Sequence, residues 1–249
     1  MRFLGIIPAR YASTRFPGKP LADLAGKPLI VRVYERVEHL FDGLVVATDD
    51  KRIFDTVQDY GGKAVMTSPD HQSGTDRCFE AYVNTGERFD VIVNVQGDEP
   101  FINPSQISLL KDCFQDETTQ IATLVKPFPA DAGFDTLFNP NTPKVILNAK
   151  RQAVYFSRSI IPYIRGKHHE EWLGSHVFYK HIGIYAYLSN VLKEITALPQ
   201  SSLEKAESLE QLRWIENGYR IKAGISNEDT IGVDTPEDLE RANRLFQAL

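Results

Sequence analysis

Three cationic side chains follow the first apolar run of the chain. Arg10, Arg15 and Lys19 lie in a loop of small residues, prolines and glycine, just after the apolar residues 3–7. Positive charge and free backbone N–H groups at the end of a buried strand are suited to binding a polyphosphate. The arginines offer forked donors and Lys19 a compact point charge, which the stiff turn at residues 17–20 would hold toward phosphate oxygens. The alternative is a solvated basic loop.

Two aspartates are candidates for holding a metal ion. Asp98 follows the apolar run at residues 91–95, and Asp234 follows another at residues 231–233, just before an expected helix. Mg²⁺ prefers oxygen ligands and usually takes one or two carboxylates, with water and phosphate completing its coordination. Each aspartate also has a structural alternative. Asp98 could cap the turn before Pro100, and Asp234 could belong to the cap of the last helix.

The apolar spacing in the first half of the chain predicts alternating strands and helices. Short continuous apolar runs are typical of buried parallel strands, and a spacing of three to four residues is typical of amphipathic helices. The expected strands are 3–7, 44–47, 63–66 and 91–95, and the expected helices are 28–40, 51–60, 74–84 and 104–114. Such units predict an α/β fold with a mostly parallel central sheet and helices on both faces. Ligands bind beyond the carboxyl ends of such strands, where the basic loop, residues 48–50 and residues 96–98 fall.

After residue 120 the pattern changes to a smaller mixed or antiparallel extension. The expected strands are 121–125, 144–147, 153–156, 181–188 and 220–224, and the expected helices are 189–198 and 203–217. Residues 127–143 read as a proline-rich loop, and the polar residues 166–175 as an exposed loop. Thr235, Pro236 and Asp238 form a capping-box pattern at the start of the last helix. With no linker or repeat, one domain over residues 1–249 is the simplest interpretation.

Composition and charge exclude several classes of function. The 249 residues carry a net charge of -5, so a general basic field for nucleic acid is not expected. The first 36 residues nevertheless carry more basic than acidic side chains, which suits a small anionic ligand. Cys78 and Cys113 form no C-x-x-C pair, which indicates two reduced, inert thiols in a cytoplasmic protein. No apolar run approaches 18 residues and no signal peptide is evident, so we expect no membrane association.

Familiar catalytic and phosphate-binding motifs are missing from the sequence. It contains neither G-x-x-x-x-G-K-[ST] nor G-x-G-x-x-G. Zinc-type ligand spacing and the hydrolase-type G-x-S-x-G elbow are also missing. A phosphate site in this chain must therefore use a different loop.

Seven blocks of the sequence resemble the 3-deoxy-D-manno-octulosonate (Kdo) cytidylyltransferases, also called CMP-Kdo synthetases. In chain order they are IPARYASTRFPGKPL (7–21), SGTDR (73–77), NVQGDEP (94–100), YFSR (155–158), HIGIY (181–185), LEQLR (209–213) and GVDTPEDL (232–239). The first block is shared with other cytidylyltransferases, including those that act on sialic acids. The SGTDR and HIGIY blocks together are specific to the Kdo branch.

The resemblance implies a fold, a reaction and an assembly. The fold is that of nucleotide-diphospho-sugar transferases. The reaction is CTP + Kdo → CMP-Kdo + pyrophosphate with Mg²⁺, which supplies activated Kdo for lipopolysaccharide assembly. The assembly is a cytoplasmic homodimer, in which residues 1–120 form the nucleotide-binding half and residues 121–249 the sugar-binding and dimerisation half.

The resemblance also assigns roles to individual residues. The catalytic residues would be Lys19, Arg15, Asp98 and Asp234, of which Asp98 and Asp234 would hold the metal. The nucleotide contacts would be Pro8, Ala9, Arg10, Arg15, Lys19, Ser73, Arg77 and Gln96. The sugar contacts would be Gln96, Arg158, His181, Tyr185, Glu207 and Gln211. Structural roles stay open for some of them: His181 could be a packed histidine, Tyr185 a core residue, and Glu207 with Gln211 a pair on one helix face.

Two other functions compete with this interpretation. The first is a cytidylyltransferase for another acidic 2-keto sugar such as a sialic acid, which would share the fold and differ only in the sugar contacts. The second is a catalytically silent nucleotide-binding or regulatory subunit. The presence of both Asp98 and Asp234 argues against it, because a silent binder could dispense with a metal pair.

Overall fold

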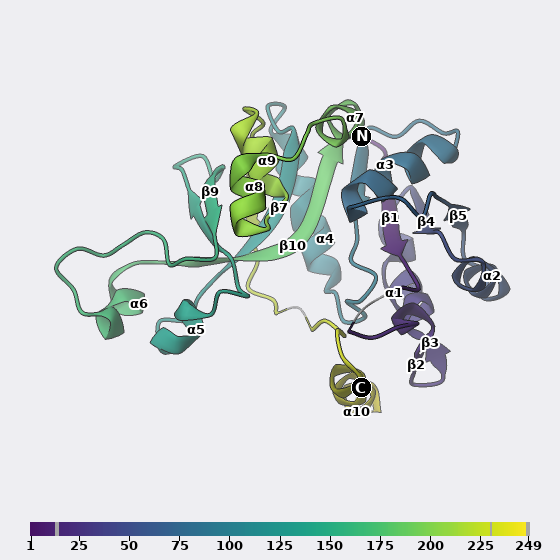
Figure 1. Ribbon diagram of the computed structural model, residues 1–249, viewed down its shortest axis with the longest axis horizontal. Helices are drawn as coiled ribbons and strands as arrows, with labels where there is room; N and C mark the ends of the chain where they lie inside the picture. Colours follow the sequence, from purple (N-terminus) through teal and green to yellow (C-terminus); the bar gives the residue numbers. More distant parts are fainter. Residues whose placement is uncertain (13–14, 230, 248–249) are drawn as a thin grey trace. The chain divides into compact units, whose positions relative to one another are not determined.

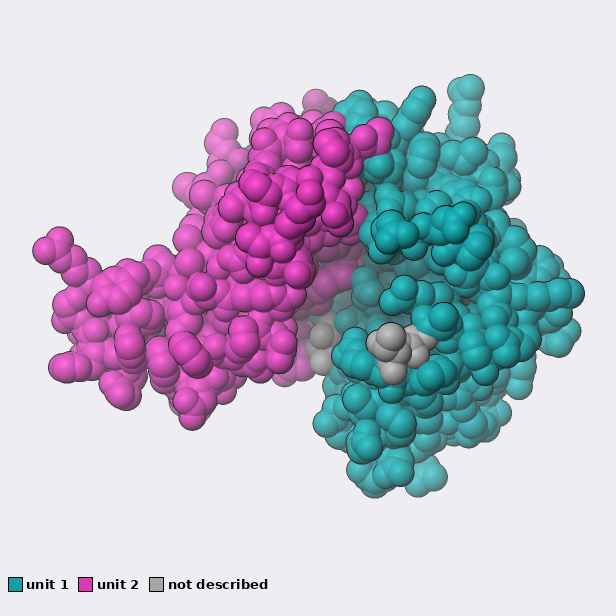
Figure 2. Space-filling view, in the orientation of Figure 1, with its two compact units in different colours: residues 1–107, 186–196, 230–249 teal, residues 108–185, 197–229 magenta. Residues whose placement is uncertain are grey.

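The computed structural model describes residues 1–12, 15–229 and 231–247 (Figure 1). The chain divides into two compact units (Figure 2). The first comprises residues 1–107, 186–196 and 230–249, and the second comprises residues 108–185 and 197–229. Residues 13–14 of the basic loop lie outside the described part of the chain.

A parallel sheet forms the centre of the first unit. Its strands are β1 (Phe3–Ala9), β4 (Gly43–Thr48), β5 (Ala64–Met66) and β6 (Val91–Asn94). Strand β1 pairs in parallel with β4 on one side and with β6 on the other, and β4 pairs in parallel with β5. The apolar side chains of β1, β4 and β6 are almost all buried, as expected for parallel strands covered on both faces.

Helices surround this sheet, as the apolar periodicity predicts. They are α1 (Leu29–Val37), α2 (Lys51–Asp59), α3 (Gly74–Asn84), α7 (Ser189–Thr196) and α10 (Pro236–Gln247), with 3-10 turns at Lys19–Leu21 and Glu38–Leu40. Helix α3 packs on β1, β4 and β6, and α2 packs on β4 and β5. Helix α4 (Pro104–Asp112) begins in this unit.

The second unit combines parallel and antiparallel strands. Its strands are β7 (Ile121–Pro127), β8 (Lys144–Leu147), β9 (Ala153–Ser157), β11 (Ile221–Ile225) and most of β10 (Tyr179–Leu188). Strands β7 and β11 pair in parallel, whereas β8 pairs antiparallel with both β9 and β10. Its helices are α5 (Phe134–Phe138), α6 (Trp172–Ser175), α8 (Ser202–Glu207) and α9 (Gln211–Glu216), with 3-10 turns at Cys113–Gln115 and His169–Glu171. The predicted mostly parallel sheet with a smaller antiparallel extension is confirmed.

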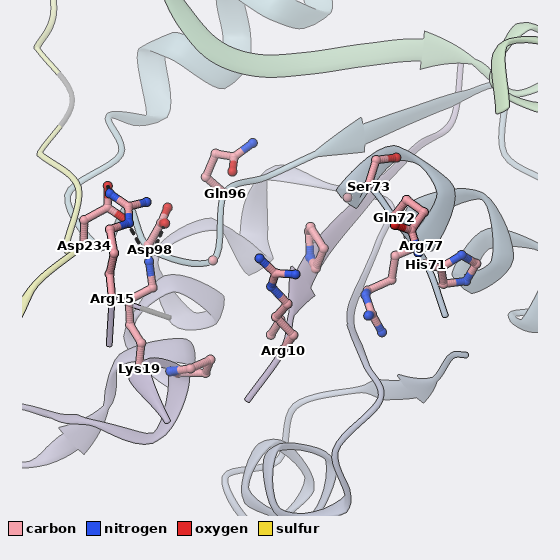
Figure 3. A pocket seen from close by; sticks show the side chains of 15 residues that line it. Arg10, Arg15, Lys19, His71, Gln72, Ser73, Arg77, Gln96, Asp98 and Asp234 are labelled. Carbon is pink, nitrogen blue, oxygen red and sulfur yellow. Dashed lines mark hydrogen bonds and ion pairs between the residues drawn. The ribbon is translucent and has the colours of Figure 1, made fainter. Parts of the chain in front are cut away.

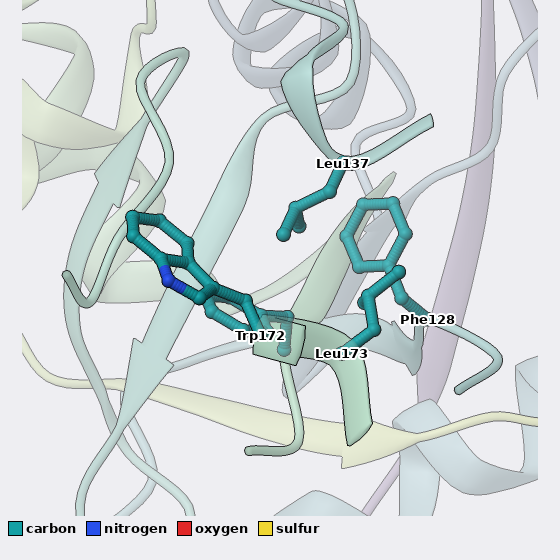
Figure 4. Packing of buried hydrophobic residues seen from close by; sticks show 5 residues of the cluster. Phe128, Leu137, Trp172 and Leu173 are labelled. Atoms are coloured by element: carbon teal, nitrogen blue, oxygen red, sulfur yellow. The ribbon is translucent and has the colours of Figure 1, made fainter. Parts of the chain in front are cut away.

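The prediction of an exposed loop at residues 166–175 is wrong in part. This segment contains α6, and its residues Trp172 and Leu173 are buried against Phe128, Leu137 and Phe178 (Figure 4). The two large apolar side chains, although they lie inside a polar stretch, pack the single turn of α6 against this small core. The expected loop at 127–143 likewise contains α5, whose Leu137 belongs to that core.

The single helix expected at residues 203–217 is also wrong. It is divided into α8 and α9 at Ser208, whose φ of 50° is left-handed and ends the first helix. The guanidinium of Arg158 donates to the carbonyl oxygens of Glu207 and Ser208, at 2.6 and 3.2 Å. The side chain of Arg158, distant in sequence, therefore stabilises the break between α8 and α9, and the local sequence pattern does not predict this break.

The start of the last helix is as predicted. The Asp238 amide donates to Thr235 Oγ1 at 3.2 Å, and the Thr235 amide donates to Asp238 Oδ2 at 3.1 Å, which is a reciprocal capping box. The sequence analysis did not predict a short hairpin formed by β2 (Asp23–Leu24) and β3 (Lys27–Pro28). Val233, before the capping box, and Ala242, after it, both pack with Leu24 of this hairpin. This packing fixes the position of the backbone at residue 234.

Two further expectations concern the cysteines and the membrane. Cys78 and Cys113 are both buried and neither forms a disulfide within the described residues, and burial raises the pKa of the Cys113 thiol to about 11. None of the described helices has the length and apolar character needed to cross a bilayer.

Candidate active site

Two loops leave the sheet side by side because β1 and β6 are adjacent parallel strands. Their register runs from Phe3 opposite Val91 to Ile6 opposite Asn94. Both chains then continue beyond the same edge, where ligands bind in sheets of this kind. A Cβ atom at Gly97 would lie only 2.9 Å from the backbone oxygen of Pro8. Glycine at this position therefore permits the close approach of the two loops.

The two aspartates converge on one lysine of the basic loop. Lys19 Nζ donates to Asp98 Oδ2 at 2.7 Å and to Asp234 Oδ1 at 3.1 Å (Figure 3). Arg15 donates to the other oxygen of Asp234 at 3.0 Å. The Val233 amide also donates to the backbone oxygen of Asp98 at 2.8 Å, which ties the two acidic segments together. Among the described residues, the two carboxylates accept hydrogen bonds from Lys19 and Arg15. The Asp234 amide donates to Asp238 Oδ2 at 3.1 Å, so the Asp234 backbone takes part in the cap of α10 as the structural alternative expects.

A pocket of about 310 Å³ opens beside this cluster. Its lining residues all belong to the first unit: Pro8, Ala9, Arg10, Arg15, Lys19, Pro20, His71, Gln72, Ser73, Gly74, Arg77, Gln96, Gly97, Asp98 and Asp234. Figure 3 shows the charged cluster at one end of the pocket, Arg10 and Gln96 in the middle, and the segment from His71 to Arg77 at the other end. Every residue predicted to contact the nucleotide lines this pocket.

The end of the pocket away from the charged cluster is formed by the N-terminus of α3. Ser73 caps this helix, since its Oγ accepts from the Asp76 amide at 3.1 Å. The Arg77 side chain is almost fully buried, and its guanidinium donates to Thr67 at 2.6 Å and to Asp49 at 2.9 Å. These bonds fix the shape of the pocket wall.

Sequence reasoning missed five lining residues: Pro20 and Gly97, which adjoin predicted residues of the two loops, and His71, Gln72 and Gly74. His71 is paired through Nε2 with Glu80 of α3. His71, Gln72 and Gly74 flank Ser73, which was predicted from the family block. Their position beside a helix start, at the edge where the loops emerge, was the available signal.

The basic loop is anchored to α2 through an aromatic contact. The Arg52 guanidinium lies 3.4 Å from the centre of the Tyr11 ring, and it also donates to both oxygens of Asp50, at 2.9 and 2.6 Å. These hydrogen bonds from Arg52 lower the pKa of Asp50, which caps α2. The loop then turns back at Gly18. Its amide donates to the backbone carbonyl oxygen of Tyr11 at 2.9 Å, and its φ of 72° is left-handed, a conformation that glycine adopts readily. Lys19 follows this turn directly.

Glu99 has an unusual protonation equilibrium for a carboxyl group. Burial, followed by the charge of the neighbouring Asp98, raises the pKa of Glu99 to about 7. One of its oxygens is buried without a hydrogen-bond partner among the described residues. Glu99 therefore carries only part of a negative charge at neutral pH.

The carboxylate pair fits a magnesium ion bound together with a substrate. No group of three or more His, Cys, Asp or Glu side chains within residues 1–12, 15–229 and 231–247 is arranged to hold a metal. Mg²⁺ does not need such a group, because it commonly uses one or two carboxylates with water and substrate phosphate. Asp98 and Asp234 supply oxygens of this kind from two segments. Both line the pocket, and their side chains are 31% and 43% exposed to solvent.

Comparison with known proteins identifies the family. The sequence profile described as cytidylyltransferase matches residues 4–222. The chain belongs to the cytidylyltransferase family. A protein of Parabacteroides distasonis, named 3-deoxy-manno-octulosonate cytidylyltransferase, is 68% identical over 243 residues, which are 97% of each chain. A protein of the same name from Bacteroides thetaiotaomicron is 65% identical over 99% of each chain.

A solved structure has the same architecture. It is described as CMP:2-keto-3-deoxy-manno-octonic acid synthetase complexed with CTP, and it matches with a TM-score of 0.90 and 43% identity over the whole of both chains. The predicted nucleotide-diphospho-sugar transferase type of fold is thereby confirmed. The chain is thus a nucleotidyltransferase of the cytidylyltransferase family.

The sugar-binding residues expected of this cytidylyltransferase lie in the second unit, apart from Gln96. Arg158 donates to the backbone oxygens of Glu207, Ser208 and Pro140 at 2.6, 3.2 and 3.0 Å. The Glu207 carboxylate accepts from the Ser157 hydroxyl at 2.6 Å and from the Arg158 amide at 2.8 Å. Arg158 and Glu207 are therefore brought together, and both hold the junction of α8 and α9.

The other sugar candidates of the cytidylyltransferase are His181 and Tyr185 on β10 and Gln211 on α9. The His181 and Tyr185 rings lie 5.3 Å apart, and Tyr185 packs edge-on against Trp214 of α9. His181 Nε2 is 3.0 Å from the Thr123 hydroxyl, and burial lowers the pKa of His181 to about 3. Burial raises the pKa of Tyr185 well above its usual value. Gln211 is buried on α9, and its Nε2 lacks a hydrogen-bond partner in the described part of the chain.

Proposed function

We propose that this protein transfers CMP from CTP to Kdo, giving CMP-Kdo and pyrophosphate, and that it does so for lipopolysaccharide biosynthesis. One observation carries the proposal: Lys19 joins Asp98 and Asp234 in a pocket that Arg10 and Arg15 also line, within a chain of the cytidylyltransferase family. The names of the relatives at 68% and 65% identity support Kdo as the sugar. The CTP complex of the 43% identical neighbour supports CTP as the nucleotide.

The reaction requires alignment and charge stabilisation. The anomeric hydroxyl of the sugar attacks the α-phosphorus of CTP in line with the departing pyrophosphate, and charge develops on the attacking and leaving oxygens. Arg15 and Lys19 would neutralise the β- and γ-phosphates, and Arg10 the triphosphate from the middle of the pocket. Ser73, Gln96 and the backbone near residue 9 would contact the base and the ribose.

Asp98 and Asp234 would hold Mg²⁺ at the charged end of the pocket. A bound divalent metal supplies several kcal/mol of charge stabilisation to such a transition state. The segments that carry the two carboxylates are held by strand β6 and by the capped helix α10, and the hydrogen bond from the Val233 amide to the Asp98 backbone oxygen joins them. Their approach is therefore set before substrate binds.

The sugar contacts of the second unit would be Arg158, His181, Tyr185, Glu207 and Gln211. Arg158 donates three of its five N–H groups to backbone oxygens of described residues, and the other two could donate to a sugar carboxylate. Gln211 offers a buried amide donor without a described partner. His181, Tyr185 and Glu207 would complete the sugar site, where neutral His181 can donate or accept a hydrogen bond.

We also propose a cytoplasmic homodimer whose contact lies in the second unit. Large apolar side chains exposed on that unit support this contact, since Phe138, Tyr163 and Val177 are each more than half exposed. Sedimentation of the wild type and of Tyr163→Glu tests it. A dimer that the substitution weakens agrees with the proposal. A wild-type monomer at micromolar concentration contradicts it.

Pyrophosphate release from CTP with a panel of 2-keto sugars tests the proposed reaction. We expect turnover with Kdo that requires Mg²⁺, and much less with sialic acids. Preference for a sialic acid would replace Kdo with another acidic sugar. Nucleotide binding without magnesium-dependent turnover on any sugar would instead indicate a silent binding subunit.

A further inference from the structure

We propose that the Lys19 ammonium and the divalent metal compete for the same site between the Asp98 and Asp234 carboxylates. When the metal binds there, the Lys19 ammonium moves to the phosphate oxygens of the nucleotide. The proposal rests on the proposed function in one respect only, namely that the pair holds a divalent metal. It adds that the lysine neutralises the pair until the metal arrives.

The observation is a single ammonium shared by two carboxylates. Lys19 Nζ bonds Asp98 Oδ2 at 2.7 Å and Asp234 Oδ1 at 3.1 Å, and its side chain is only 14% exposed. Because both bonds end on one nitrogen atom, the two oxygens face a common point. That point is where a cation bound by both aspartates has to lie.

Lys19 and a divalent ion cannot both remain at that point. Mg²⁺ binds carboxylate oxygens at about 2.0–2.1 Å. An ion that ligated these two oxygens would sit within a few ångströms of an ammonium that hydrogen-bonds the same atoms. Like charges so close repel each other strongly, and the lysine N–H groups would compete for the lone pairs that the metal needs.

The exchange needs no movement of the loop backbone. Three backbone hydrogen bonds hold the chain at Lys19. The Lys19 amide donates to the Phe16 oxygen at 3.2 Å, the Ala22 amide donates to the Lys19 oxygen at 3.1 Å, and the Leu21 amide donates to the Gly18 oxygen at 2.9 Å. The side chain beyond it is a flexible four-carbon stem. It lines the same pocket as Arg10 and Arg15, so phosphate oxygens bound there lie within its reach.

This exchange couples the binding of metal and nucleotide. Without nucleotide, a metal ion has to displace Lys19 and leave the ammonium without a carboxylate partner. With nucleotide, phosphate oxygens accept the displaced ammonium. The metal site is therefore weak in the free enzyme and becomes strong when the substrate arrives, which limits the capture of stray divalent ions.

Binding of Mn²⁺ alone, measured by electron paramagnetic resonance without nucleotide or sugar, tests the exchange. Lys19→Met should bind Mn²⁺ at least tenfold more tightly than the wild type. Arg15→Gln is the matched control, because it removes an equal charge whose carboxylate contact among the described residues is with Asp234 alone, at 3.0 Å. It should change the affinity by less than threefold. Equal gains in the two variants would indicate a general charge effect, and no gain for Lys19→Met would exclude competition. Either result overturns the proposal.

A second measurement uses the wild-type protein and does not depend on how the variants fold. Acetylation of Lys19 by a small amine-reactive ester is followed by peptide mass spectrometry, with and without saturating Mg²⁺. We expect the metal to accelerate labelling of Lys19 at least threefold and to leave Lys27, which pairs with Glu35, unchanged. An unchanged rate at Lys19 overturns the proposal. Neither measurement involves turnover or sugar, so failure of the proposed reaction would be seen separately.

Discussion

Replacing Asp234 or Asp98 with asparagine should reduce kcat by at least about 100-fold, which corresponds to about 2.7 kcal/mol of transition-state stabilisation. Asparagine keeps the shape of the side chain but removes the negative charge and one strong oxygen ligand. The structure places both carboxylates at the charged end of the pocket, where they share Lys19. Loss of either one should therefore reduce the rate far more than it reduces CTP binding.

The cost of the same substitutions to folding should be much smaller. The ion pairs of Asp98 and Asp234 are partly exposed, with carboxylate side chains 31% and 43% accessible. Such pairs contribute at most about 1 kcal/mol each. For a chain of 249 residues this corresponds to a few degrees in Tm. A large loss of kcat with a small change in Tm separates catalysis from stability.

The assay is pyrophosphate release at saturating CTP and Kdo over a range of Mg²⁺, beside thermal unfolding. Asp229→Asn is the matched control, because Asp229 also bridges two lysines, Lys126 at 2.7 Å and Lys180 at 3.1 Å, but belongs to the second unit. It should retain nearly full activity. Nearly normal kcat in both Asp98→Asn and Asp234→Asn, with an unchanged magnesium requirement, would refute the reasoning.

Three further predictions concern the loop anchor, pH and the core of the second unit. Tyr11→Ala should raise KM for CTP about two- to fivefold in steady-state kinetics, since it removes the stack with Arg52, whereas Tyr60→Ala should not. Because burial lowers the pKa of His181 to about 3, the unfolded chain binds an extra proton below about pH 6.5. The free energy of unfolding by urea should fall by about 2 kcal/mol from pH 7 to pH 5 through this residue alone. His181→Phe should lack this loss. If the free energies of unfolding of the wild type and of His181→Phe changed in parallel with pH, the prediction would be contradicted. Glu204→Gln should lower the free energy of unfolding by urea by about 3–5 kcal/mol, because the buried Arg213 guanidinium loses the Glu204 carboxylate that it contacts at 2.6 and 2.8 Å. Adding Arg213→Met to Glu204→Gln should restore most of this stability. A Glu204→Gln variant as stable as the wild type would contradict the prediction.

The sequence predicts the first unit better than the second for a physical reason. Buried parallel strands such as β1 and β6 are continuous apolar runs, and their short connections make the alternation with helices visible. The second unit depends on contacts between distant residues. Ser208 adopts its left-handed turn beside donors from Arg158, fifty residues earlier in the chain. Trp172 is buried by a small core that its polar neighbours in sequence conceal.

The site was predictable to the extent that topology determines it. The carboxyl ends of adjacent parallel strands meet at one edge, so Gln96 and Asp98 had to emerge near Arg10. The approach of Asp234 depends on the packing of α10, which the capping pattern located without indicating its partners. The pairing of Lys19 with both aspartates could not be predicted, because the same residues were expected to bind different groups, phosphate and metal.

The most direct test of this account is a crystal structure with a non-hydrolysable CTP analogue and Mg²⁺. The account predicts that oxygens of both Asp98 and Asp234 ligate one metal ion, and that Lys19 has left them for the phosphates of the nucleotide. A nucleotide bound in this pocket with Lys19 still between the two carboxylates, and with the metal elsewhere, would contradict it.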